Sequence, residues 1–226
     1  MAKMSVFALL FHSSLWWRPG LSQHVPIDDA VEVYFGCGCF WHVQHEFVRL
    51  EQHLLGRQGS EVTARAAYAG SSQVGDNGLV CYHNAAGLAD YGSLGHGEVV
   101  SLKIPKPKFQ SFAEEYFEKI CPEGLRADPQ DVGGEYRSLI GIPGGMDSTL
   151  GSVLKRAARD VRLLVGHGSE GDTLAERSVL VYDSTKFPGH EAEKYHQFHD
   201  DMMEQYSSDY HSLKQYAVGS ECPNDM

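Results

Sequence analysis

The chain has 226 residues, of which 42% are hydrophobic and 22% charged, an ordinary composition for a globular protein. Asp and Glu number 30 against 19 Lys and Arg, and the net charge of −11 disfavours binding to nucleic acid or to an anionic membrane surface. The length indicates about one domain, and no apolar run reaches the ~18 residues of a membrane helix.

The first 29 residues carry a mixed signal. Lys3 precedes an apolar stretch at 4–11, as in a secretory signal, but no small-residue cleavage site follows. We therefore expect residues 1–29 to be an N-terminal extension of a cytoplasmic protein. A secretory or organelle leader is the alternative.

A strand and a helix open the folded region. Residues 31–35 are typical of a β-strand, bounded by Gly36 and Gly38. Apolar side chains then recur every three or four positions from 40 to 54, which predicts a helix ending at Gly56.

The central part of the chain mixes strands, loops and one further helix. In chain order, the predicted elements are a strand at 62–69, a loop at 71–96, a strand at 98–104, a helix at 109–120, a loop at 122–134 and a strand at 136–142. Loops as long as the first of these are usually functional in a compact domain.

The last third is predicted to contain two helices and a strand. The first helix begins near Asp147 or Ser148 and continues to Leu164, with Gly166 as its stop. A strand follows at 179–182 and a helix at 190–206. Because strands and helices are mixed without strict alternation, we expect a single α+β domain with a mixed sheet and packed helices.

Cys39 stands out among five cysteines, an odd number that leaves room for at least one working thiol. It lies at the predicted start of the first helix, where unpaired amides and the helix dipole should lower its pKa. Gly36 and Gly38 permit a tight turn before it, and Phe40 and Trp41 place two aromatic side chains directly after it.

The run Gly38-Cys39-Phe40-Trp41 resembles the signature of the A-type peptide methionine sulfoxide reductases. Further similar segments follow in the family's order, at 68–70, at 95–100, at Asp131 with 135–138, and at 192–197. The resemblance covers about residues 30–200. It implies a ferredoxin-like sandwich, with a catalytic domain at 30–216 and a C-terminal tail at 217–226.

The resemblance implies reduction of methionine S-sulfoxide to methionine. Cys39 would attack the sulfur and become a sulfenic acid. Glu98 would protonate the departing oxygen, and burial would raise its pKa so that it holds a proton at neutral pH. Phe40 and Trp41 would enclose the substrate methyl group.

Tyrosine hydroxyls would hydrogen-bond the sulfoxide oxygen. The resemblance assigns this role to Tyr136, and we expect Tyr82 to be the second tyrosine, with Tyr91 as the alternative. Asp131 would orient a water, the Tyr136 region or the substrate backbone. His42 stands where the family has glycine and adds bulk near the pocket.

A second thiol is expected to resolve the sulfenic acid. In the family it usually comes from a flexible C-terminal tail, which points to Cys222; Cys37, two residues before Cys39, is the rival. Cys81 and Cys121 are weaker candidates. We expect a monomer without bound cofactor or metal, acting on oxidised proteins or peptides and on free methionine sulfoxide, with thioredoxin or another dithiol as reductant.

Two other functions compete with the reductase. One is a non-catalytic thiol redox sensor, which would need neither Glu98 nor Tyr136. The other is a metal-binding module, built on Cys37 and Cys39 with histidines of the segment at 190–199.

Overall fold

The computed structural model describes residues 29–200 and 205–223, so that nearly all of the predicted N-terminal extension lies outside the described residues. The strands are β1 Ala30–Gly36, β2 Arg65–Ala69, β3 Gly97–Pro105, β4 Leu139–Ile142, β5 Arg162–Val165, β6 Ser178–Asp183 and β7 His190–Glu191. The α-helices are α1 Phe40–Leu50, α2 Phe109–Glu115, α3 Thr149–Ala158 and α4 Ser208–Ser212.

The centre of the sheet has the ferredoxin-like order β4-β1-β3-β2. These neighbours are antiparallel, with α1 between β1 and β2 and α2 between β3 and β4 along the chain. β6 and β5 extend one edge in parallel, and β7 adds a short antiparallel strand at the other. This confirms the expected α+β sandwich in one domain.

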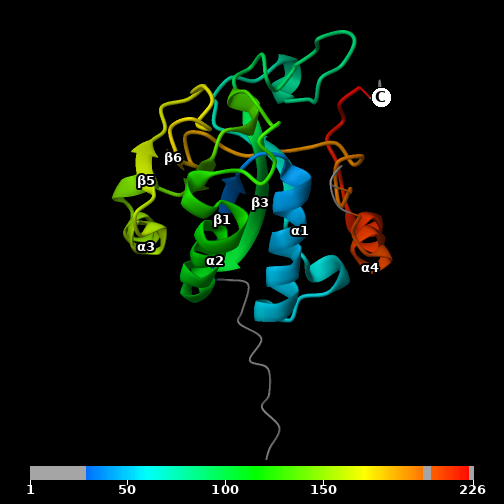
Figure 1. Ribbon diagram of the computed structural model, residues 1–226. Helices are drawn as coiled ribbons and strands as arrows, with labels where there is room; N and C mark the ends of the chain where they lie inside the picture. The colour runs from blue at the N-terminus through cyan, green and yellow to red at the C-terminus, as the bar shows by residue number, and fades with distance from the viewer. Residues whose placement is uncertain (1–28, 201–204, 224–226) are drawn as a thin grey trace, which may run out of the picture.

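The three longer helices cover one face of the sheet (Figure 1). Val31, Val33 and Phe35 of β1 point into this main core, where Phe35 packs against Phe47 of α1. Tyr34 points to the opposite face and joins a smaller cluster there. Alternate side chains of β1 therefore point into two different cores on opposite faces of the sheet, as the period of two in the sequence predicts. No helix within the described ranges is long and apolar enough to cross a membrane.

The helices predicted at 40–54 and 109–120 are confirmed, each with a change of winding near its end. α1 passes into a π-helical turn at Glu51–Leu55, and α2 passes into one at Tyr116–Ile120. Gly56 ends the first helix in the left-handed conformation, with φ of 70°, which glycine adopts without steric cost.

The predicted extension of the third helix to Leu164 is wrong. α3 begins after Ser148, whose side chain caps it, but ends at Ala158. Residues 162–165 form β5 instead, with Leu163 against the main core and Leu164 against the smaller cluster. Side chains that alternate between two buried faces demand a strand, and the helical spacing was a coincidence of short apolar runs.

The helix predicted at 190–206 is also wrong where the chain is described. β7 opens this segment, and turns without a helix follow as far as residue 200. The Gln197 side chain bonds the backbone of Ala66 in both directions, so this segment packs as an extra edge of the sheet. The prediction also missed α4, which Ser207 caps.

A buried carboxylate explains why β2 begins later than predicted. Glu51 accepts hydrogen bonds from the backbone amides of Thr63 and Ala64, at 2.7 and 3.2 Å, so these residues are held against the helix end. Arg57 lies 2.6 Å from the same carboxylate and neutralises it. The predicted strand at 136–142 is shortened similarly, because Gly134–Tyr136 forms a 3₁₀ turn.

We expect Glu51→Ala to lower the free energy of unfolding by about 3 kcal/mol or more, because it leaves Arg57 and two backbone amides without their acceptor. Urea denaturation of the two proteins measures this difference. The matched control is Glu118→Ala, which removes an exposed ion pair with Arg159 and should cost less than about 1 kcal/mol. Equal losses in the two variants would contradict the structural role of Glu51.

Candidate active site

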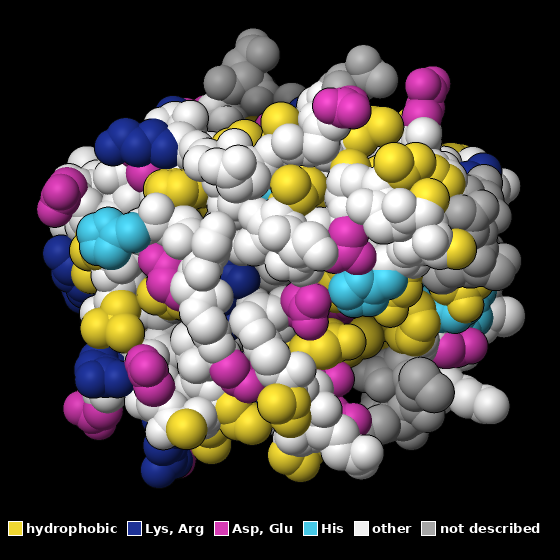
Figure 2. Space-filling model, turned by 90° about the horizontal axis from the view of Figure 1, so that it is seen from above, with side chains coloured by type: hydrophobic (Ala, Val, Ile, Leu, Met, Phe, Trp, Pro, Cys, Tyr) yellow, Lys and Arg dark blue, Asp and Glu magenta, His cyan; other side chains and the backbone are white. Residues whose placement is uncertain are grey.

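The predicted site residues other than Cys222 meet at one end of the sheet, where α1 begins and β3 starts. The long loops after β2 and α2 also reach this end, at the top of Figure 1. A pocket of about 170 Å³ lies here, lined by Cys39, Phe40, Trp41, Tyr82, Glu98, Asp131 and Tyr136, together with Cys37. Figure 2 views this end of the molecule and shows acidic, histidine and hydrophobic side chains near one another on it.

Cys39 occupies the N-cap position of α1, as the sequence predicts. Gly38 precedes it with φ of 74°, and a side chain there would lie 2.7 Å from the Asp131 carboxylate. The backbone amide of Cys39 donates to Asp131 at 2.8 Å. The turn therefore needs glycine, and Asp131 fixes the backbone from which the Cys39 thiol extends.

Glu98 is the second residue of β3 and is 2% exposed. One of its oxygens accepts the Phe40 amide at 2.9 Å, and the other lies 3.3 Å from the Tyr91 hydroxyl, which donates to it. Burial raises the pKa of Glu98 to about 8, and the nearby charge of Asp131 acts in the same direction. This carboxyl therefore holds a proton at pH 7 and is able to donate it.

Three tyrosines surround Glu98 in different ways. Tyr82 and Tyr136 are half-buried and line the pocket, whereas Tyr91 is fully buried behind it. Burial and the charge of Glu98 raise the pKa of Tyr82 to about 12 and raise the pKa of Tyr136 as well. Both hydroxyls therefore keep their protons at neutral pH. Tyr91 contacts the carboxyl itself.

His196 packs behind the pocket against three of its lining side chains, although it was not among the predicted site residues. Its ring lies 4.4 Å from that of Tyr82 and 5.1 Å from that of Phe40, and it also packs beside Trp41. Burial lowers the pKa of His196 to about 3, so the ring is neutral at pH 7. Its ring nitrogens and the Trp41 indole nitrogen make no hydrogen bond within the described residues. The similar segment at 192–197 was the sequence signal that could have indicated this residue.

The cysteines are paired in a way that the sequence did not predict. Cys37 forms a disulfide with Cys121, and Cys81 forms one with Cys222, so Cys39 alone lies outside both disulfides. Cys222 is buried rather than carried on an open tail, and neither Cys81 nor Cys222 lines the pocket. Of the two proposed resolving cysteines, the structure places only Cys37 at the pocket.

His42 also lines the pocket, next to Trp41. The candidate ligands of the rival metal module, Cys37, Cys39 and the histidines at 190–199, do not form a metal-binding group within the described residues, and Cys37 is bonded to Cys121. One group in the described part of the chain could hold a metal ion, and it is a different one: Cys81, Glu193 and Cys222.

Comparison with solved structures finds similar folds. Reduced Mxr1 from Saccharomyces cerevisiae superposes with a TM-score of 0.51 at 18% identity, over 81% of this chain and 91% of that one. Methionine sulfoxide reductase A of Corynebacterium diphtheriae gives a TM-score of 0.46 at 16% identity, over 78% and 75% of the two chains. No family model and no curated protein matches the sequence. At this level of identity, the likeness to Mxr1 establishes the fold.

The raised pKa of Glu98 predicts a pH-dependent stability. The unfolded carboxyl ionises near 4.5 while the folded one keeps its proton up to about 8, so the free energy of unfolding falls as pH rises through this window. Glu98→Gln removes this proton linkage, and we expect it to gain stability relative to the natural chain by roughly 1 kcal/mol per pH unit. Urea denaturation from pH 5 to pH 8 tests this, and parallel curves for the two proteins would contradict it.

Proposed function

We propose that this protein is a thiol-dependent reductase that converts methionine S-sulfoxide to methionine. The observation that carries the proposal is the pairing of a thiol with a protonated carboxyl at one pocket, since Cys39 and Glu98 both line it and Glu98 holds its proton near pH 7. A redox sensor would need no buried proton donor beside its thiol. The resemblance of the Gly38–Trp41 run to the reductase signature supports the same function.

In the proposed reaction, the Cys39 sulfur attacks the sulfur of the sulfoxide. Glu98 gives its proton to the sulfoxide oxygen, which makes that oxygen a better leaving group. The sulfur–oxygen bond breaks, and the oxygen ends on Cys39. The net step turns a sulfoxide and a thiol into a thioether and a sulfenic acid, so two electrons pass from Cys39 to the substrate.

The remaining pocket residues would bind and orient the sulfoxide. Tyr82 and Tyr136 keep their hydroxyl protons, so both are able to donate to its oxygen. Phe40 and Trp41 would enclose the methyl group in an apolar cage. We assign Asp131 a positioning role, because its carboxylate holds the Cys39 amide.

We also propose that Cys37 resolves the sulfenic acid and that Cys121 then takes over the disulfide. Before turnover, all three cysteines are thiols. The Cys37 sulfur attacks the sulfenic acid and forms a Cys37–Cys39 disulfide with loss of water. Cys121 next attacks the Cys37 sulfur and releases Cys39 as a thiol. The product of this relay is the Cys37–Cys121 disulfide that the structure contains, with Cys39 ready for another substrate.

An external dithiol must reduce Cys37–Cys121 to complete the cycle, and a cytoplasmic protein of the thioredoxin type has this chemistry. The pocket would accept a methionine sulfoxide side chain from an oxidised protein or peptide, or the free amino acid. No bound cofactor takes part in the steps proposed.

A single-turnover assay tests the reductase. Fully reduced protein is mixed with each methionine sulfoxide epimer separately, without added reductant, and methionine is counted. We expect about one methionine per chain from the S epimer alone. Cys39→Ser should form none, and Glu98→Gln should react about 100-fold more slowly, the usual scale for loss of a general acid. Methionine from the Cys39→Ser variant, or from neither epimer with the natural chain, would exclude the proposal.

Mapping the cysteines after one turnover tests the relay. The natural chain should lose two thiols and contain Cys37–Cys121, whereas Cys121→Ser should stop at Cys37–Cys39 after forming the same methionine. Cys222→Ser is the matched control and should give the natural pattern, because Cys222 does not line the pocket. A Cys39–Cys222 disulfide in the natural chain would overturn the relay while leaving the reductase intact.

A further inference from the structure

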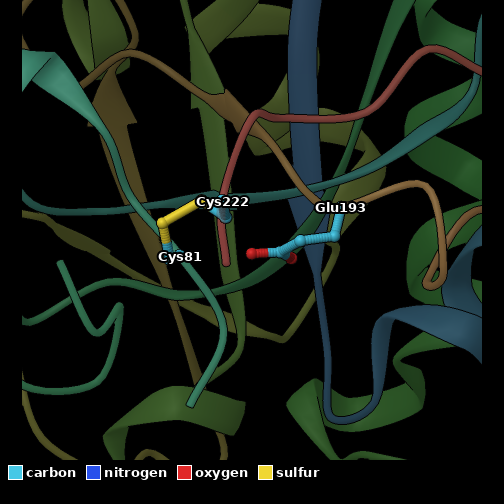
Figure 3. Close-up of side chains that lie close together, drawn as sticks. All are labelled: Cys81, Glu193 and Cys222. Carbon is cyan, nitrogen blue, oxygen red and sulfur yellow. A yellow bond between two sulfur atoms is a disulfide. The ribbon is translucent and has the colours of Figure 1, made fainter. Parts of the chain in front are cut away.

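A second cluster of reactive side chains lies outside the catalytic pocket. Cys81 of the long loop, Cys222 of the tail and Glu193 are all buried, and one ligand atom from each lies within 4.8 Å of the others. Figure 3 shows the Glu193 carboxylate pointing toward the Cys81–Cys222 disulfide. Three segments that are distant in sequence therefore meet at one buried place.

Glu193 is a buried carboxyl group without a lysine or arginine partner in the described residues. Its carboxylate is 3% exposed and accepts hydrogen bonds from the Tyr82 amide and the Tyr68 hydroxyl, both at 2.8 Å. No lysine or arginine in the described ranges forms an ion pair with it. A buried carboxylate is normally paired with a cationic side chain or with a metal ion.

His196 supplies an independent indication of a missing ligand. The residue is 1% exposed, and neither of its ring nitrogens has a hydrogen-bond partner within the described part of the chain. Its Nε2 atom lies 3.9 Å from a Glu193 oxygen, too far for a hydrogen bond but close to the separation of two atoms that share a metal ion. Buried polar atoms without partners often mark an absent water or ion.

We propose that, once the Cys81–Cys222 disulfide is reduced, Cys81, Cys222 and Glu193 bind a zinc ion, and that His196, which lies beside Glu193, moves in as the fourth ligand. Two thiolates, a carboxylate and an imidazole are all ligands that zinc accepts in a tetrahedral site, and thiolates favour zinc over magnesium or calcium. The disulfide state seen here and the zinc state exclude each other, because both use the same two sulfurs.

The chemistry of the exchange is balanced. A dithiol of the class that serves the proposed reductase gives two electrons and two protons to open the disulfide. Zinc then displaces the two thiol protons, and no further electron is transferred. The hydrogen bonds from Tyr68 and Tyr82 to Glu193 would remain as outer-shell contacts that orient the ligand. In either state, the cluster fastens the C-terminal tail to the loop that carries Tyr82.

Metal retention tests the site without using the reductase activity, so its outcome is independent of the proposed function. The full chain with Cys37→Ser, Cys39→Ser and Cys121→Ser keeps only the two cysteines of the cluster. After reduction, incubation with zinc and desalting, we expect one zinc ion per chain, and none when the disulfide is intact. Cobalt(II) in place of zinc should produce thiolate-to-cobalt charge-transfer absorption.

Single substitutions in this background identify the ligands. Cys222→Ser should abolish retention, and Glu193→Gln or His196→Gln should weaken zinc binding by at least the ~10-fold typical of losing an outer-shell partner. Glu191→Gln, two residues away on β7, is the matched control and should leave the affinity unchanged. Absence of zinc from the reduced background protein, or its retention after Cys222→Ser, would overturn the proposal. If circular dichroism shows that the background protein does not fold, Cys222→Ser and Cys121→Ser are made singly in the natural chain and compared after reduction. Only Cys222→Ser should lose this zinc ion.

Discussion

The structure of the site depends on the N-terminus of α1 and on the two carboxyl groups that satisfy it. Asp131 accepts the Cys39 amide and Glu98 accepts the Phe40 amide, although they lie 92 and 58 residues away along the chain. The amides at a helix start have no partner within the helix, so distant acceptors are needed when water is excluded. Meeting this requirement brings the loop after α2 and the first residues of β3 to the same place as Cys39.

Burial raises the pKa of the Glu98 carboxyl well above that of an exposed glutamate. Glu98 lies inside the protein, and the desolvation outweighs the hydrogen bonds from Phe40 and Tyr91 that would favour its charged form. The buried carboxyl therefore lowers the stability of the folded protein at the pH values where it would ionise in the unfolded chain. The same burial makes Glu98 a proton donor near neutral pH. It also raises the pKa of Tyr82 and Tyr136, so that their hydroxyls stay protonated.

Local pattern was sufficient for the elements that bury one continuous face. The run from Phe40 to Leu54 and the strand at 31–35 were predicted correctly because helical and strand periods are unambiguous over such lengths. The short apolar run at 161–164 fits either period, and its true strand state depends on a place beside β6. The segment at 190–200 fails as a helix because its side chains and backbone bond to β2, which no local pattern reveals.

The sequence by itself determined the α+β class, the position of Cys39 at a helix start and the residue types of the pocket, because each follows from neighbours in the chain. Only the tertiary structure decided which cysteines pair, since disulfides join residues 84 and 141 positions apart whose approach depends on the whole fold. It also decided that Tyr82 lines the pocket while Tyr91 lies behind it against Glu98. Burial is a property of the packed molecule, and the proton on Glu98 and the unsatisfied ring of His196 both follow from burial.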